Sequence, residues 1–192
     1  MSETADEPRA GRRVFFALWP DDATRSALRF ATQRAVQACG GRPIAKDNLH
    51  LTVAFLGELT AEGLGLARSV PPFQVGEFEL TLDALGVWPE SKILWLAPLA
   101  PPPALGELEA RLWDELAERG FRAAERVYRP HVTLARRARP VEQAVEPVRW
   151  PVRELALVES VPYGKNVHYE VLDRWPLSHL QSTGQITSIG VQ

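Results

Sequence analysis

The sequence repeats one pattern, first as His50-Leu51-Thr52-Val53-Ala54-Phe55-Leu56 and again as His131-Val132-Thr133-Leu134-Ala135. Each stretch is typical of a β-strand, in which successive side chains point to opposite faces. The apolar face, which we expect to pack on the core, carries Leu51, Val53 and Phe55 in the first copy and Val132 and Leu134 in the second. The opposite face carries His50, Thr52 and Ala54, and His131, Thr133 and Ala135. Each strand therefore presents a histidine and a threonine side by side, away from the core.

The first histidine strand belongs to a longer unit. An apolar strand is expected at residues 14–19, and Asp21 and Asp22 then supply the oxygen acceptors that cap the start of a helix. Gly40-Gly41 ends that helix. The histidine strand follows, and a further strand is expected at residues 78–87.

The same order of elements recurs around the second histidine strand. A strand at residues 93–97 is followed by a proline break at 101–103 and by a leucine-rich helix that ends at Gly120. The second histidine strand comes next, and strands are expected at 154–161 and 168–175. Two copies with a period near 80 residues are too few and too long for a solenoid. The repeat predicts an α+β, bilobal fold, in which two pseudo-symmetric strand-helix-strand-strand halves surround a central cleft and each carries one His-x-Thr motif.

Length and composition set the outer limits. The chain has 192 residues, of which 45% are hydrophobic and 24% charged, and these proportions exclude wholesale disorder, collagen and coiled coil. We expect one bilobal domain over residues 12–177, with flexible tails at 1–11 and 178–192, because the tails lack core periodicity.

Location follows from what the sequence contains. The longest apolar runs fall far short of the ~20 residues that span a bilayer, and the acidic start at residues 1–7 is not a secretory signal. The single cysteine, Cys39, cannot form an internal disulfide and fits a reducing compartment. We expect a cytoplasmic monomer that makes no contact with membranes.

The charge of the chain is unevenly distributed. A net charge of −2 argues against broad coating of a nucleic-acid backbone. A local basic segment nevertheless spans residues 121–139, where the arginines at 122, 126, 129, 136, 137 and 139 face only Glu125. This segment predicts a local site for an anion.

Two facing histidine strands suit chemistry at phosphorus. A pseudo-two-fold axis would bring both imidazoles and both threonine hydroxyls to opposite sides of one cleft. In-line displacement at phosphorus needs a base beside the entering oxygen and an acid beside the leaving oxygen. Histidine, with an ordinary pKa of ~6.5, serves in either role, and threonine hydroxyls donate to the non-bridging oxygens.

Three other side chains leave alternatives open. Strict alternation puts Arg136 on the face of Val132, so it reaches the phosphate only if the strand ends or bulges near Ala135; otherwise it belongs to a solvated rim. Phe55 is expected in the core, although an aromatic ring near a cleft can stack on a base. His168 and His179 lack a threonine partner and are expected on the surface.

These features together resemble the two-histidine (2H) phosphoesterase superfamily, and within it the LigT-like RNA 2',3'-cyclic phosphodiesterases, also called 2'-5' RNA ligases. The resemblance covers most of residues 12–177. It is carried by Val14-Phe15-Phe16-Ala17-Leu18-Trp19-Pro20, Asn48-Leu49-His50-Leu51-Thr52-Val53-Ala54-Phe55-Leu56-Gly57, Arg129-Pro130-His131-Val132-Thr133-Leu134-Ala135-Arg136, Leu157-Val158-Glu159-Ser160 and Tyr169-Glu170-Val171-Leu172.

The resemblance implies a reaction and assigns roles to residues. It implies opening of a terminal 2',3'-cyclic phosphate, on RNA ends or small nucleotides, to a 2'-phosphate, with no metal and no cofactor. His50 would donate a proton to the leaving 3' oxygen, and His131 would activate water. Thr52 and Thr133 would hold the phosphate, and Arg136 would join them if the strand ends or bulges near Ala135. The reverse reaction, with a 5'-hydroxyl in place of water, would form a 2'-5' linkage without ATP.

Two competing functions remain at this point. Metal-assisted hydrolysis would need His50, His131 and a third ligand such as His168 on zinc, but no His-x-x-His or Glu-x-x-His spacing supports it. An RNA-end or cyclic-nucleotide binding module would keep the cleft without turnover. Both complete His-x-Thr motifs weigh against that, because a binder needs no acid and base on opposite flanks.

Overall fold

The computed structural model describes residues 11–124, 127–164 and 166–178. All of the tail predicted at 1–11 except Gly11, all of the tail predicted at 178–192 except Ser178, and His179 lie outside the described residues. The described helices include none that is long and apolar enough to cross a membrane.

The described elements follow the order expected from the sequence, with additional short elements between them. The helices are α1 (Asp22–Ala38), α2 (Ala61–Arg68) and α3 (Pro103–Glu118), with a short 3-10 helix η1 (Lys46–Asn48). The strands are β1 (Arg12–Leu18), β2 (Arg42–Pro43), β3 (Leu51–Leu59), β4 (Phe78–Leu82), β5 (Ala84–Trp88), β6 (Ile93–Ala97), β7 (Val132–Arg136), β8 (Val148–Val152), β9 (Glu154–Tyr163) and β10 (Asn166–Pro176).

Local chemistry explains where the two long helices begin. The Asp21 carboxylate accepts a hydrogen bond from the backbone N–H of Thr24 at 2.7 Å and caps α1. α3 begins with a proline in its first turn, where the missing N–H costs nothing. The inward stripe of α3 is fully buried and consists of Leu105, Leu108, Leu112 and Leu116.

The strand order of the main sheet reflects the sequence repeat, because equivalent strands of the two copies lie on opposite sides of its centre. Its strands run β10-β9-β1-β3-β7-β6-β5, all neighbours are antiparallel, and β2 pairs with β7. β3 and β7 are the central neighbours. Outward from them come β1 and β6, and then β9 and β5. β4 and β8 form a separate two-stranded sheet, so the strand predicted at 78–87 is two strands in two sheets.

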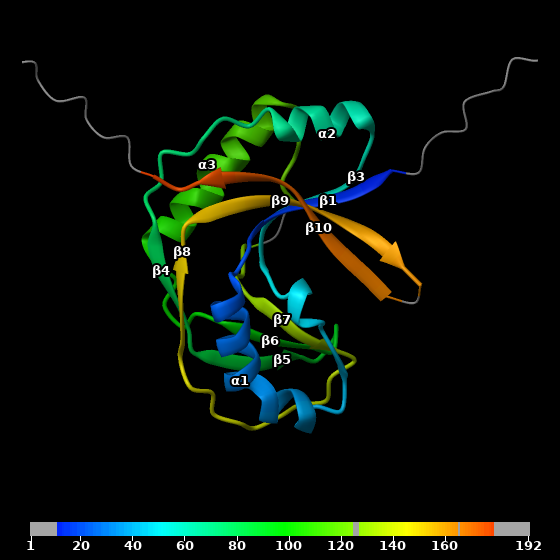
Figure 1. The fold of residues 1–192 in the computed structure, drawn as a ribbon, viewed down its shortest axis with the longest axis vertical. Coiled ribbons are helices and arrows are strands. Elements are labelled where there is room, and N and C mark those ends of the chain that lie inside the picture. The colour runs from blue at the N-terminus through cyan, green and yellow to red at the C-terminus, as the bar shows by residue number, and fades with distance from the viewer. Residues whose placement is uncertain (1–10, 125–126, 165, 179–192) are drawn as a thin grey trace, which may run out of the picture.

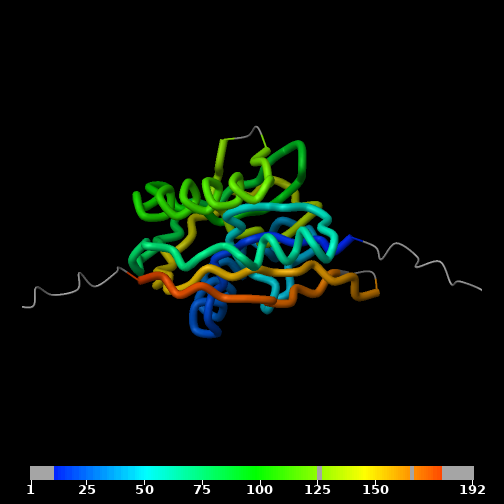
Figure 2. Tube along the Cα trace, turned by 90° about the horizontal axis from the view of Figure 1, so that it is seen from above, coloured from blue at the N-terminus to red at the C-terminus, as the bar shows by residue number. Residues whose placement is uncertain are grey.

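The structure does not confirm two consecutive halves as separate lobes, because each half completes the sheet of the other. β5 follows β3 in the sequence but pairs with β6, and β9 follows β7 but pairs with β1. The helices also pack on strands of the other half, since α1 contacts β7 and β8 while α3 contacts β3. Figure 2 shows α1, in blue, and α3, in green, on opposite sides of the molecule, and Figure 1 shows the strands between them.

A β-bulge interrupts each histidine strand at the same position. In β3, Thr52 lies opposite Ala17 and Ala54 opposite Phe16, so Val53 is the extra residue. In β7, Thr133 lies opposite Trp95 and Ala135 opposite Leu94, so Leu134 is the extra residue. Beyond an extra residue the side chains exchange faces. Ala54 and Ala135 therefore enter the core, where both are buried.

The bulges also redirect the residues that follow the two alanines. Phe55 and Arg136 lie one residue beyond the buried alanines, and both share the face of the histidines. The prediction that Phe55 packs in the core is therefore wrong, because strict alternation does not hold across the bulge. Its side chain is 49% exposed.

Gly86 on β5 makes room for a ring that supports the second histidine strand. A Cβ atom at Gly86 would lie 2.4 Å from the Trp95 ring, and the Trp95 and Trp88 ring centroids are 5.7 Å apart. We expect Gly86→Ala to lower the free energy of unfolding by about 1–3 kcal/mol, because the indole must shift within a packed layer. Thermal or urea unfolding measures the effect.

Gly65→Ala on α2 is the matched control, because a Cβ there meets nothing within 4 Å. The same change is expected to be neutral or to stabilise the protein by about 0.4–1 kcal/mol. Equal stabilities for the two variants would contradict the close approach at Gly86.

Candidate functional site

The two histidine strands meet at a single register pair, in which Leu51 of β3 lies opposite Val132 of β7. These are the central residues of the two His-x-Thr motifs. Antiparallel pairing places residue 50 across from residue 133 and residue 52 across from residue 131. Each imidazole thus has the threonine of the other strand as its cross-strand neighbour.

Both motifs line one pocket of about 220 Å³. The residues predicted as site residues are all part of its lining: His50, Thr52, His131, Thr133 and Arg136. The rest of the lining consists of Arg13, Phe15, Ile44, Asn48, Phe55, Ile93, Ser160 and Tyr169. We call this space the histidine pocket.

The two imidazoles are held in the same way. The Nδ1 atom of His50 lies 2.7 Å from the backbone oxygen of Asn48, and the Nδ1 atom of His131 lies 2.7 Å from that of Arg129. A carbonyl oxygen can only accept a hydrogen bond, so each Nδ1 carries a proton and donates it. In each neutral ring the Nε2 atom is left with the lone pair. It can take up a proton as a base and return it as an acid.

Aromatic rings confine His50 more than His131. Phe15 and Tyr169 lie with ring centroids 4.8 and 5.0 Å from that of His50, and Trp19 stacks on it at 5.7 Å. His131 and Trp88 form a T-shaped pair with ring centroids 4.5 Å apart. The two histidines are alike in their backbone anchors but differ in their surroundings.

The surroundings lower the pKa of both imidazoles. For His50, burial lowers the pKa from 6.5 to about 4; the hydrogen bond to Asn48 opposes this, and the charges of His131 and Arg136 add to it. Burial also lowers the pKa of His131, against the hydrogen bond to Arg129, and Arg136 lowers it further. Both rings are therefore neutral in the free protein near pH 7, because a charge buried beside a cation is unfavourable.

Asn48 is a positioning residue that the sequence reasoning missed. Its side-chain Nδ2 donates to the backbone oxygen of Val167 at 2.7 Å, and its Oδ1 accepts from the backbone N–H of Tyr169 at 3.3 Å. Asn48 thereby joins β10 to the turn that anchors His50. Its place two residues before a histidine of the repeat could have drawn attention to it.

Arg13 and Phe55 form one side of the histidine pocket. The Arg13 guanidinium carbon lies 4.9 Å from the centroid of the Phe55 ring. Arg137 and Arg139, which follow Arg136 in the sequence, are exposed and line neither this pocket nor its larger neighbour. Of these three consecutive and near-consecutive arginines, Arg136 alone lines the histidine pocket.

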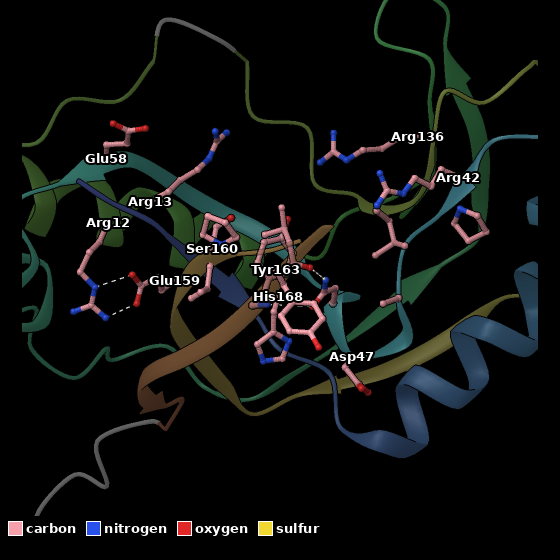
Figure 3. Close-up of a pocket in the computed structure, with 18 of the residues that line it drawn as sticks. Arg12, Arg13, Arg42, Asp47, Glu58, Arg136, Glu159, Ser160, Tyr163 and His168 are labelled. Carbon is pink, nitrogen blue, oxygen red and sulfur yellow. Dashed lines mark hydrogen bonds and ion pairs between the residues drawn. The ribbon is translucent and has the colours of Figure 1, made fainter. Parts of the chain in front are cut away.

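A larger cavity of about 1120 Å³ adjoins the histidine pocket and shares six lining residues with it (Figure 3). We call it the outer cavity. His168 is exposed and lines the outer cavity but not the histidine pocket, so it does not join His50 and His131. Within the described parts of the chain, no group of three His, Cys, Asp or Glu side chains could hold a metal ion.

This geometry defines a class of protein. Two imidazoles with available Nε2 atoms, two hydroxyls and an arginine on the lining of one small pocket can perform acid-base chemistry on an anionic phosphate ester. The comparisons with known proteins agree. A family model described as the 2'-5' RNA ligase superfamily matches residues 19–162, and the chain belongs to that superfamily.

Similar proteins from two bacteria cover almost the whole fold. The RNA 2',3'-cyclic phosphodiesterase of Escherichia coli is 35% identical over 173 residues, which cover 87% of this chain and 97% of that protein. That of Thermus thermophilus is 32% identical and covers 86% of this chain and 90% of its own length. The crystal structure of E. coli LigT complexed with 3'-AMP matches with a TM-score of 0.78 and 32% identity, over 88% of this chain and 99% of that one.

The low pKa of His50 has a consequence for titration. We expect the His50 ring in the free protein to take up its proton well below pH 6.5, near pH 4. Inorganic phosphate should raise that pKa, because an anion in the pocket favours the imidazolium. Histidine Cε1–H resonances, with His50→Ala used for assignment, report both values by NMR.

The same shift predicts how stability depends on pH. Between pH 6.5 and about 4 the unfolded chain binds a proton at residue 50 that the folded chain does not, so the free energy of unfolding falls as pH falls through this window. A His50 pKa near 6.5 that phosphate leaves unchanged would contradict the account.

Proposed function

We propose that this chain is an RNA 2',3'-cyclic phosphodiesterase that opens a terminal 2',3'-cyclic phosphate to a 2'-phosphate, with His50 and His131 as acid and base and without a metal. The observation that carries the proposal is the matched anchoring of the two imidazoles, which leaves both Nε2 atoms available on the lining of one pocket. Relatives at 32–35% identity carry this activity in their names.

The proposed reaction is an in-line displacement at phosphorus. His131 Nε2 takes a proton from water as the water oxygen bonds to phosphorus. The bond from phosphorus to the 3' oxygen breaks, and the Nε2–H of protonated His50 gives its proton to that oxygen. The phosphate stays on the 2' oxygen. After the step His131 is protonated and His50 neutral, and proton exchange with solvent restores the starting forms.

The bound phosphate ester itself helps to protonate His50. The empty pocket disfavours a protonated His50, whereas a bound phosphodiester monoanion favours it, because opposite charges attract strongly where water is scarce. Thr52, Thr133 and Arg136 are proposed to bind the non-bridging oxygens. Their hydrogen bonds would strengthen as charge develops on these oxygens.

The same groups would allow ligation. If a 5'-hydroxyl takes the place of water, His131 takes its proton as the 5' oxygen bonds to phosphorus. The bond from phosphorus to the 3' oxygen breaks, His50 protonates that oxygen, and a 2'-5' linkage forms without ATP. We also propose that the protein acts as a cytoplasmic monomer, since one chain supplies both histidine strands and the thiol of Cys39 is free.

Removing either histidine should abolish most of the activity. We expect His50→Ala and His131→Ala each to lower kcat/KM by roughly two or more orders of magnitude on RNA that ends in a 2',3'-cyclic phosphate. A chelator should leave the wild-type rate unchanged, and product analysis should give a 2'-phosphate. Wild-type turnover by either variant, or a loss with chelator that zinc restores, would overturn the mechanism.

Arg136 and its neighbour Arg137 give a matched pair of variants. Arg136 lines the histidine pocket and Arg137 does not, although both are exposed arginines at adjacent positions. We expect Arg136→Gln to lower kcat/KM about 10- to 100-fold, as the loss of a charged hydrogen bond to phosphate does. Arg137→Gln should change it little. Equal losses in the two variants would assign only a general electrostatic role to Arg136.

A further inference from the structure

The outer cavity leads away from the histidine pocket and is about five times larger. Both spaces share six lining residues: Arg13, Ile44, Asn48, Arg136, Ser160 and Tyr169. Pockets that enclose a small ligand usually measure ~300–1000 Å³. The histidine pocket, at about 220 Å³, has room for the reacting group, whereas the outer cavity, at about 1120 Å³, exceeds what one nucleotide requires. The combined space suits a substrate that continues beyond its reacting end.

The outer cavity is basic in a chain whose net charge is −2. Its lining includes five arginines, at positions 12, 13, 29, 42 and 136, and three carboxylates, at positions 47, 58 and 159. Arg12 and Glu159 neutralise each other, because the guanidinium donates to both carboxylate oxygens. In the rest of the lining four arginines outnumber the two carboxylates of Asp47 and Glu58. The excess positive charge favours a ligand with more than one phosphate.

An exposed aromatic side chain lies in this basic surrounding. Tyr163 ends β9, and 75% of its surface is exposed although it lines the outer cavity. Figure 3 shows it between the Arg12–Glu159 ion pair on one side and Arg42 and Arg136 on the other. A flat ring beside cations is an arrangement that binds single-stranded nucleic acid, because bases stack on the ring while phosphates meet the cations.

We propose that the outer cavity binds the RNA segment that precedes the terminal cyclic phosphate. Tyr163 stacks on the base of the penultimate nucleotide, and Arg13 and Arg42 contact the backbone phosphates. The inference rests on the proposed function and adds a subsite for the nucleotide that precedes the reacting one, together with the residue that stacks on its base. Tyr163 is in this account a specificity-determining residue with no part in proton transfer.

The test compares two substrates that react at the same group. One is adenosine 2',3'-cyclic phosphate, and the other is a triadenylate that ends in the same cyclic phosphate. We expect the wild type to prefer the triadenylate in kcat/KM. Tyr163→Ala should lower kcat/KM for the triadenylate roughly 5- to 100-fold, as the loss of a base-aromatic stack does, and leave the mononucleotide unchanged.

Two further variants separate stacking from other effects. Tyr163→Phe should keep the preference, because the ring and not the hydroxyl provides the stack. Phe30→Ala removes an aromatic side chain that is 84% exposed on α1 and lines neither space, so both substrates should react as with the wild type. Arg13→Gln should make the rate on the triadenylate less sensitive to salt, since one phosphate contact is lost.

The outcomes distinguish the inference from the proposed function. If the wild type opens both substrates with equal kcat/KM, or if Tyr163→Ala slows both equally or neither, the outer subsite is overturned while the proposed function stands. If the wild type opens neither substrate, the proposed function fails, and the inference fails with it.

Discussion

The pairing of β3 with β7 at Leu51 and Val132 is the constraint on which the rest of the site depends. This register brings the two histidine strands together at the centre of the sheet, so that each imidazole lies beside the threonine of the other strand. A slip of one residue would turn a whole histidine strand over and send its histidine into the core. β9, from the second half, pairs with β1 of the first half, and β5, from the first half, pairs with β6 of the second. These exchanged pairings support the register between β3 and β7.

The bulges at Val53 and Leu134 occupy equivalent positions in the two histidine strands, but the residues that they bring to the lining of the histidine pocket differ. The same local device presents Phe55 on one strand and Arg136 on the other. Three aromatic rings surround His50, whereas among the described residues His131 forms one ring pair, with Trp88. In the proposed mechanism these different surroundings let His50 take up a proton when the anion binds while His131 stays neutral, so that one pocket holds an acid and a base. The lowered pKa of His50 also makes its proton depend on the arriving anion.

Much of the fold could be predicted from the sequence because alternation, caps and proline or glycine breaks are local signals. These signals located the two long helices and most of the strands, and the paired His-x-Thr motifs indicated the family. Strand exchange between the halves could not be predicted, because pairing depends on distant contacts. The bulges also could not be predicted from the sequence. For that reason Phe55 was predicted to lie in the core, and the position of Arg136 was not decided. Asn48 acts through contacts with β10 that lie more than a hundred residues away.

A substrate whose 3' oxygen is replaced by sulfur tests the central claim most directly, namely that the two imidazoles act on opposite sides of one phosphorus atom. A thiolate, whose acid has a pKa of ~8.5, leaves without a proton, whereas an alkoxide needs one. The account predicts that His50→Ala opens the sulfur substrate at close to the wild-type rate, while His131→Ala stays inactive on it. Rescue of His131→Ala, or no rescue of His50→Ala, would contradict the assignment of acid and base.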